Sequence, residues 1–202
     1  MSKKAIVLLA EGFEEVEAIT PIDYLRRVGI EVTIAAVGPE DIGACPCITG
    51  SHGITLCADA SLLTLAGEGK LDPSLWDAVI IPGGLPGADN LSASKETGAF
   101  LKDMAGAGKW ICAICAAPAR VLSRLGLLKG RKFTCFPGEE ARIKAEDSGA
   151  EFSQDRVVVD QNILTSRGAG TAGEFACAII SALLGAGEGK KLAEKVLLSG
   201  AV

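Results

Sequence analysis

The stretch that decides the fold is Trp110-Ile-Cys-Ala-Ile114, followed by Cys115 and by Ala116-Ala-Pro-Ala-Arg-Val-Leu-Ser-Arg-Leu125. The first run is continuously apolar and predicts a strand buried on both faces, whereas the second has a helical pattern. Cys115 therefore stands at a strand-to-helix turn of the nucleophile-elbow kind, where amide N–H groups and the helix dipole favour thiolate over thiol. The alternative is a buried cysteine that packs as a small hydrophobic side chain.

The rest of the chain alternates between apolar runs typical of strands and amphipathic runs typical of helices. Strands are expected at residues 4–10, 31–37, 77–81, 110–114 and 132–135, with hairpins at 54–57 with 62–65 and at 157–160 with 163–166. Helices are expected at residues 14–28, 95–107, 118–127, 139–146, 173–184 and 190–198, and a loop at 38–51. This order predicts an α/β fold with a mostly parallel sheet and helices on both faces. Ligands of such folds bind beyond the carboxyl ends of the strands.

Size and composition narrow the class of protein. A chain of 202 residues, 49% hydrophobic and 22% charged, fits one globular domain over residues 1–202. The net charge of -5 and the lack of a basic stripe argue against a specific nucleic-acid partner. No apolar run approaches the roughly 20 residues that span a bilayer, so we expect no membrane association. Seven cysteines without an export signal indicate a reducing compartment, which we expect to be the cytoplasm.

A glycine-rich turn, Pro82-Gly-Gly-Leu-Pro-Gly87, follows the strand at 77–81. Glycines let backbone amides approach a ligand closely, so Gly83 and Gly84 could join the Ala116 amide in an oxyanion hole beside the thiol. The alternative is a tight turn without a ligand. The turn has neither the Gly-Lys-Ser/Thr of a P-loop nor dinucleotide spacing, and we expect no cofactor.

Four carboxylates, Glu11, Glu14, Glu15 and Glu17, crowd the start of the first helix. The helix dipole alone would favour them there. Glu14 and Glu17 lie one turn apart and share a face. A carboxyl beside a thiolate would have a raised pKa and could donate a hydrogen bond to sulfur, which makes one of them a candidate acid/base partner.

The other cysteines offer no second catalytic thiol. Cys112 lies three extended residues before Cys115, so their Cα atoms are about 10 Å apart, too far for a disulfide. Cys45-Pro-Cys47 could be half a metal site, but no matching cluster exists, and we expect no metal. A further group is expected to serve as packing residues: Cys57, Cys135 and Cys177.

His52 is the only histidine, so a Cys-His-Asp/Glu triad would have to use it. It lies upstream in an edge-like segment, where an exposed loop histidine is the simpler interpretation. Without a histidine base, cysteine-protease and glutaminase chemistry is disfavoured. A low-pKa cysteine assisted by a carboxylic acid remains, and that pair suits thiol addition to a reactive carbonyl or oxidation by peroxide.

Four segments resemble the signature segments of the ThiJ/PfpI superfamily, in its parkinsonism-associated deglycase and YajL-like branch: Leu9–Ala18, Ile81–Ala88, Ala113–Pro118 and Leu164–Thr171. The resemblance implies a flavodoxin-like three-layer sandwich and a homodimer. It also implies that Cys115 is the nucleophile, that Glu17 is a protonated glutamate bonded to it, and that Gly84 and Ala116 donate backbone amides. Further pocket or dimer contacts are then expected at Glu14, Arg27, His52, Arg167 and Gly168.

Members of this superfamily are described as glutathione-independent glyoxalases, as deglycases of methylglyoxal- and glyoxal-modified amines and thiols, and as oxidation-sensing chaperones. Ala116 stands where the protease-like branch carries a histidine, which argues against a peptidase. Phe136 occupies a position that is histidine in animal members, and His52 one that is often arginine near the dimer contact. A flavodoxin-like binding protein with an incidental thiol stays open as a third hypothesis.

Overall fold

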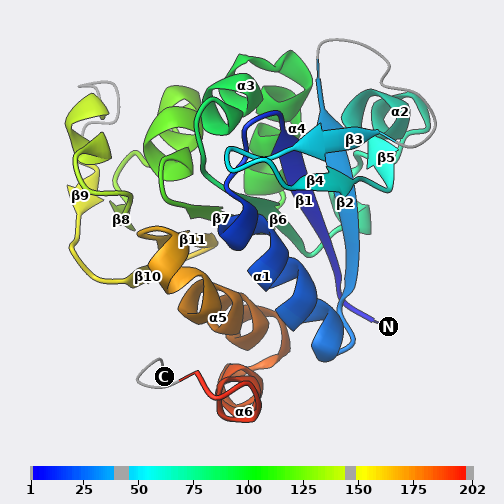
Figure 1. The fold of residues 1–202 in the computed structure, drawn as a ribbon. Coiled ribbons are helices and arrows are strands. Elements are labelled where there is room, and N and C mark those ends of the chain that lie inside the picture. Colours follow the sequence, from blue (N-terminus) through cyan, green and yellow to red (C-terminus); the bar gives the residue numbers. More distant parts are fainter. Residues whose placement is uncertain (1, 39–45, 144–148, 199–202) are drawn as a thin grey trace.

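The computed structural model describes residues 2–38, 46–143 and 149–198, built around a seven-stranded sheet (Figure 1). The strand order is β10-β11-β7-β6-β1-β2-β5. The bounds are β1 Lys4–Ala10, β2 Glu31–Val37, β5 Ala60–Ser61, β6 Ala78–Ile81, β7 Trp110–Ile114, β10 Val157–Asp160 and β11 Ile163–Ser166. Neighbouring strands are parallel except for β10 and β11. The carboxyl ends of β1, β6 and β7 therefore meet at one edge of the sheet.

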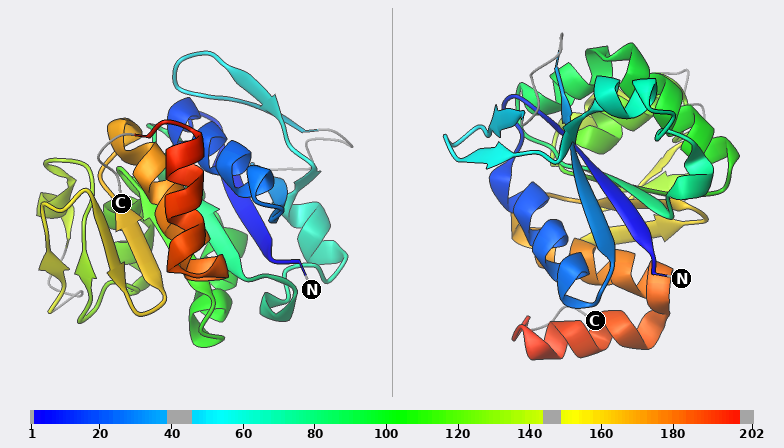
Figure 2. Two further views of the ribbon diagram at one scale, coloured as in Figure 1. Left: turned by 90° about the horizontal axis from the view of Figure 1, so that it is seen from below. Right: turned by 90° about the vertical axis from the view of Figure 1, so that its right-hand side faces the viewer.

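Helices cover both faces of the sheet (Figures 1 and 2). Alternate residues of β1 point to opposite sides: Ala5, Val7 and Leu9 pack in the cluster that includes residues of α1 (Glu15–Arg27), α5 (Ala172–Leu184) and α6 (Ala186–Lys195). The intervening residues pack in a second cluster, with α2 (Leu62–Gly67), α3 (Gly87–Ala93) and α4 (Lys95–Gly106). This layering confirms the predicted flavodoxin-like sandwich. None of the helices in the described ranges is long and apolar enough to cross a bilayer.

The most strongly patterned elements agree with the sequence. Strands β1, β2, β7, β10 and β11 have the predicted bounds, and β6 begins one residue later. Helices α1, α4 and α5 lie within one residue of prediction, whereas α6 begins four residues early and α3 was not predicted. Strands β1, β6 and β7 are clear in the sequence because they are buried on both faces, which requires continuous apolar runs.

The segment predicted as a hairpin of residues 54–57 with 62–65 is different. Leu62–Leu65 is helical, because the Ser61 hydroxyl accepts a hydrogen bond from the Thr64 amide at 3.0 Å and caps α2. The partner of β4 (Thr55–Cys57) is instead β3 (Cys47–Thr49), inside the region predicted as a loop. Residues 39–45 of that predicted loop lie outside the described residues.

The chain after β7 is also less regular than predicted. A π-helical turn, η2 (Pro118–Leu122), runs into a 3₁₀ turn, η3 (Ser123–Leu125), and Gly126 at φ 73° ends the segment. The short helix predicted at 139–146 is the 3₁₀ turn η4 (Glu139–Arg142), and residues 144–146 lie outside the described ranges. The strand predicted at 132–135 is β8 (Lys132–Phe133), which pairs with β9 (Glu151–Phe152).

The β3–β4 hairpin extends outward beside the start of α1 (Figure 2). Backbone bonds hold its turn end: the Gly12 amide donates to the Thr49 carbonyl, and the Ser51 amide donates to the Phe13 carbonyl, each at 2.8 Å. Ile48, 2% exposed, packs into the core cluster that contains α1. The hairpin is thus fixed to the segment that carries the glutamate cluster.

Candidate active site

Cys115 follows the last residue of β7 with φ 64°, a left-handed conformation that is costly for a residue with a side chain. Two backbone bonds hold it there. The Cys115 amide donates to the Ser166 carbonyl at 3.0 Å, and its carbonyl accepts from the Phe136 amide at 2.8 Å. The half-buried thiol therefore sits at a sharp turn at the carboxyl end of the sheet.

Glu17 reaches the thiol from the first turn of α1. Its side chain is 1% exposed, hydrogen-bonds the Cys115 side chain, and accepts the Gly83 amide at Oε2 over 2.9 Å. Burial raises the pKa of Glu17 to about 7; the bonds from Cys115 and Gly83 oppose this shift, and the charge of Glu14 adds to it. The carboxyl can therefore exchange a proton close to neutral pH.

The surroundings of the Cys115 thiol shift its pKa in two opposite directions. Burial raises the pKa of Cys115, and the Glu17 charge and hydrogen bond raise it further. The backbone amides of Ala116 and Gly84 bond the sulfur and lower the pKa. Because the buried sulfur and carboxylate disfavour carrying charge together, the pair loses its first proton near pH 7 and keeps the second to higher pH.

This result corrects the expectation of a thiol whose pKa is lowered by a helix dipole. The segment after Cys115 is a π turn followed by a 3₁₀ turn, so no long α-helix points at the sulfur. Two amides face it instead, and burial outweighs them. The nearest group that could take the thiol proton is the Glu17 carboxyl.

Gly83 fits beside the Cys115 and Glu17 side chains because it has no side chain of its own. A Cβ there would lie 2.7 Å from Cys115 Cβ, 2.8 Å from Glu17 Oε2 and 3.1 Å from the Ala116 nitrogen. The neighbouring Gly84 has φ 87°, which favours glycine. Gly83 is thus required by the packing of the site, and Gly84 by the backbone of the turn.

We expect Gly83→Ala to separate Cys115 from Glu17 and to destabilise the fold by roughly 1–3 kcal/mol, the usual cost of overpacking. Denaturant unfolding and the rate of Cys115 alkylation measure the two effects. Gly106→Ala is the matched control, because a Cβ there meets nothing within 4 Å and the position is helical. Equal stability of Gly83→Ala and Gly106→Ala would contradict this packing.

The raised pKa of Glu17 also makes stability depend on pH. Between pH 4.5 and about 7 the folded state holds a proton that the unfolded state has released, so stability falls as pH rises through this window. The full shift corresponds to at most about 3 kcal/mol. We expect Glu17→Gln to lose this slope and to unfold at higher denaturant concentration than wild type at pH 7.5. A parallel slope in both proteins would contradict the assignment.

Gly168 forms another wall of the site. A Cβ there would lie 3.8 Å from Glu17 Oε1 and 3.3 Å from Phe136 Cδ2. The Thr171 hydroxyl accepts the Gly168 amide at 3.1 Å and donates to its carbonyl at 2.8 Å, which fixes the turn after β11. Phe136, 48% exposed, stands at the rim.

Glu15, one of the four carboxylates from which the acid/base candidate was drawn, has a structural role. It is 3% exposed and accepts the His52 amide at 2.7 Å and the Ile54 amide at 3.2 Å, which ties the hairpin to α1. The sequence did not indicate this role of Glu15, because the hairpin that supplies the two amides was predicted as a loop. His52 Nδ1 lies 3.0 Å from Glu15 Oε2 and 3.2 Å from Glu14 Oε2.

These three side chains could supply metal ligands, since Glu14, Glu15 and His52 each bring one ligand atom to within 4.8 Å of the others. Their mutual bonds already account for the cluster. The Glu15 hydrogen bond and the charges of both glutamates raise the pKa of His52, so the ring is favoured as a cation between two carboxylates. The prediction that the protein uses no metal stays untested.

Two predicted contacts lie away from the thiol. Arg27 is in the last turn of α1, about 15 Å along the helix from Glu17, and its Nε pairs with Asp23 at 2.7 Å. Arg167 precedes Gly168, but its guanidinium carbon lies 5.8 Å from the ring centroid of Phe152. Arg27 is therefore not a pocket residue, and its role as a dimer contact remains a prediction.

The other cysteines divide by exposure. Cys112, Cys135 and Cys177 are buried, as expected of packing residues. Cys57 is exposed, which corrects its assignment to packing. It lies opposite Cys47 in the hairpin. The sequence did not predict this pair, because Cys47 falls in the region expected to be a loop.

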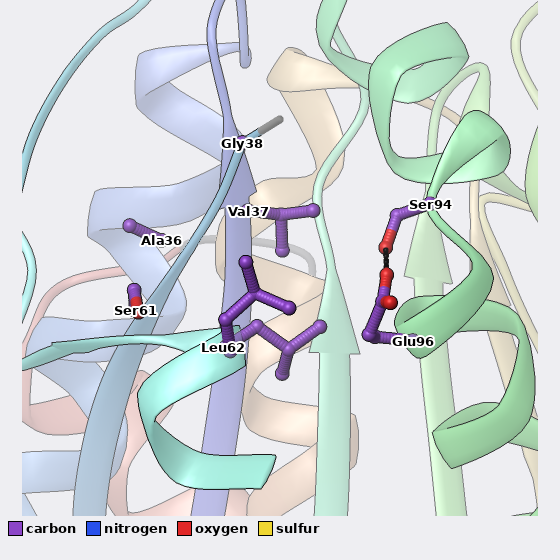
Figure 3. A pocket seen from close by; sticks show the side chains of 8 residues that line it. Ala36, Val37, Gly38, Ser61, Leu62, Ser94 and Glu96 are labelled. Atoms are coloured by element: carbon purple, nitrogen blue, oxygen red, sulfur yellow. Dashed lines mark hydrogen bonds between the residues drawn. The ribbon is translucent and has the colours of Figure 1, made fainter. Parts of the chain in front are cut away.

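A separate small pocket lies between β2, α2 and α4 and contains none of the site residues (Figure 3). Val37 and Leu62 form its apolar floor, and the Ser94 hydroxyl donates to Glu96 Oε2 at 3.2 Å at its edge. The glutamate and the hydroxyl satisfy each other, so this pocket offers no reactive group.

The site thus consists of a half-buried cysteine at a sharp turn, a buried glutamate and a glycine-rich turn, and known proteins resemble this chain in sequence and fold. A sequence model of the DJ-1/PfpI family matches residues 3–182. The chain belongs to the DJ-1/PfpI family. The Parkinson disease protein 7 homolog of Danio rerio is 40% identical over 184 residues, which are 91% of each chain.

Two other DJ-1/PfpI relatives are a protein named as a deglycase and a protein of known structure. Deglycase TK1284 of Thermococcus kodakarensis is 33% identical over 164 residues, 81% of this chain and 89% of the relative. The structure described as oxidized Toxoplasma gondii DJ-1 superposes with a TM-score of 0.85 at 35% identity, covering 97% of this chain and 98% of that one. The family thus includes a protein named as an enzyme and one studied in an oxidised form.

Proposed function

We propose that this protein is a cysteine-dependent, glutathione-independent glyoxalase and deglycase. Its substrates are methylglyoxal, glyoxal and the early adducts that they form with amines and thiols. The observation that carries the proposal is the hydrogen-bonded Cys115–Glu17 pair, in which a carboxyl with a pKa of about 7 adjoins a nucleophile. The deglycase among the relatives supports this class of reaction.

The first step is addition of sulfur to the aldehyde carbon. Glu17 takes the thiol proton as the C–S bond forms, and the carbonyl π electrons move to oxygen. The amides of Gly84 and Ala116, which bond the resting sulfur, turn to the developing oxyanion. Glu17 then delivers the thiol proton to the oxyanion, which gives a hemithioacetal and restores the carboxylate. In an early glycation adduct this carbon is a hemiaminal or hemithioacetal. Its bond to the amine or thiol breaks first, the hydroxyl proton passes to the departing group, and the aldehyde that re-forms accepts the sulfur.

Glu17 then carries protons between the two carbons of the substrate. It removes the proton from the sulfur-bearing carbon to give an enediol, and returns a proton to the neighbouring carbon. The result is a thioester of lactate, or of glycolate from glyoxal. Water adds to the thioester carbon, the C–S bond breaks, and the thiol is regenerated. No external oxidant or reductant is needed, because one carbon is oxidised as the other is reduced.

Turnover by the reduced protein tests the proposal. Purified protein incubated with methylglyoxal is expected to form lactate faster than the spontaneous reaction, with many lactate molecules per protein. A double variant, Cys47→Ser with Cys57→Ser, controls for consumption of aldehyde by exposed thiols and should keep the activity. Lactate formation at the spontaneous rate alone would rule out the enzyme.

A second candidate function is an oxidative-stress sensor or redox-regulated chaperone. The oxidised state studied for the Toxoplasma gondii relative favours it. Glu17 as an acid, with the Gly84 and Ala116 amides, could stabilise a sulfinate on Cys115. After mild peroxide treatment, intact mass should show two added oxygen atoms confined to Cys115. Oxygen spread over several cysteines, or absent from Cys115, would eliminate this function.

The assembly and surroundings belong to the same proposal. We expect residues 1–202 to act as one domain in a cytoplasmic homodimer without a cofactor. Glu14, at the start of α1, and His52, in the turn of the hairpin, would lie near the dimer contact. Sedimentation of the purified protein would reveal the dimer.

A further inference from the structure

The β3–β4 hairpin carries two cysteines at directly opposed positions. The register pairs Cys47 with Cys57, Ile48 with Leu56, and Thr49 with Thr55. Ile48 is buried, whereas both cysteines are exposed. The cysteines therefore share the outer face of the hairpin, away from the core.

The backbone bonds identify which kind of pair this is. The Ala58 amide donates to the Pro46 carbonyl at 2.8 Å, and the Gly50 amide donates to the Ile54 carbonyl at 2.9 Å. Hydrogen-bonded and non-hydrogen-bonded pairs alternate along an antiparallel ladder, so Cys47 and Cys57 form a non-hydrogen-bonded pair. Such pairs have Cα atoms about 4.5 Å apart, within the span that a disulfide accepts.

The side chains agree with the backbone. The two sulfur atoms lie 2.7 Å apart, closer than van der Waals contact between sulfurs. The next pair on this face repeats the approach, with Thr49 Oγ1 and Thr55 Oγ1 at 3.1 Å. No movement of the strands is needed to join the two sulfurs.

We propose that Cys47 and Cys57 are a second redox site, a dithiol that a low-molecular-weight disulfide closes reversibly into a cross-strand disulfide. One thiolate attacks a sulfur of the small disulfide, forms a mixed disulfide and releases one small thiolate. The second cysteine thiolate then attacks the protein sulfur of that mixed bond, and the other small thiolate leaves. The two cysteines lose two electrons and two protons, and the small disulfide becomes two thiols.

Closure would join the two strands of the hairpin that donates the His52 and Ile54 amides to Glu15. It consumes neither Cys115 nor Glu17. The site therefore responds to the thiol–disulfide balance, while the elbow cysteine stays available for its own chemistry. The inference holds whether or not the proposed carbonyl chemistry is correct.

The test uses the fully reduced protein treated with oxidised glutathione, then with an alkylating reagent. The tryptic fragment from residue 28 to residue 70 holds three cysteines, Cys45, Cys47 and Cys57. We expect this fragment to be two hydrogen atoms lighter after oxidation and to take up one alkyl group, on Cys45, in place of three. Dithiothreitol should restore all three labels.

Variants distinguish this bond from its rivals. Cys47→Ser and Cys57→Ser should each abolish the internal bond, and Cys45→Ser should keep it. Four results would each overturn the proposal. They are three retained labels, a stable glutathione adduct without ring closure, a bond that requires Cys45, and a disulfide-linked dimer on a non-reducing gel. Lactate formation is not part of the readout, so failure here is separate from failure of the proposed enzyme.

Discussion

Cys115→Ser is expected to lower the rate of lactate formation from methylglyoxal by a factor on the order of 10³ or more. A serine hydroxyl ionises far less readily than a thiol, and Glu17, with a pKa of about 7, is too weak a base to compensate. The backbone turn should survive, because its bonds to the Ser166 carbonyl and from the Phe136 amide involve no side chain of residue 115. The measurement is lactate against time at fixed protein concentration.

Cys47→Ser is the matched control for this substitution. It makes the same chemical change at an exposed thiol of the hairpin and should leave the rate within about twofold, as expected of a surface change outside the site. Equal rates for wild type and Cys115→Ser would show that another group carries the reaction. A folded Cys115→Ser protein, checked by circular dichroism, excludes unfolding as the cause of a lost rate.

Glu17→Gln is expected to lower the same rate by roughly 10²–10⁴-fold, the usual contribution of a general acid/base. Glutamine retains the size and can still accept the Gly83 amide through its carbonyl, but it cannot take the thiol proton or carry protons between carbons. Adduct formation should therefore survive better than conversion to lactate. Mass spectrometry of protein mixed with methylglyoxal would show adduct accumulating on Cys115.

Glu15→Gln provides the control on the same helix. Glu15 is also buried, but its carboxylate is held by the His52 and Ile54 amides and does not bond the thiol. We expect this variant to keep most of the activity while losing stability. A loss of rate equal to that of Glu17→Gln would mean that the helix start, and not the Glu17 carboxyl, is what the reaction requires.

The sequence was sufficient for the parts of the molecule that are determined locally. Strand β7 and the elbow at Cys115 follow from an apolar run that stops at a cysteine and turns at once. The rule that ligand groups gather at the carboxyl ends of parallel strands indicated the glutamate cluster and the glycine-rich turn, and the family resemblance singled out Glu17 and Gly84. These residues meet in the structure because β1, β6 and β7 are neighbours.

The parts that could not be predicted depend on tertiary contacts. The apolar run at Leu62–Leu65 fits a strand or a helix equally, and the Ser61 cap decides for helix. Strand β3 is only three residues long, too short to show a strand pattern in the sequence, and it forms by pairing with β4. The pKa of Cys115 depends on burial and on Glu17, so the local pattern suggested the wrong direction.

The coupling of Cys115 to Glu17 is tested most directly by the rate of Cys115 alkylation by iodoacetamide, measured from pH 5 to pH 10 in wild type and Glu17→Gln. If the two groups titrate as a pair, the wild-type rate should first rise near pH 7, where the pair loses its first proton, and the step for the second proton should lie above the ordinary pKa of a cysteine. The Glu17→Gln profile should show a single step that belongs to the thiol alone. Superimposable profiles with one step near 8.5, the ordinary value of a cysteine, would contradict a coupled Cys115–Glu17 pair.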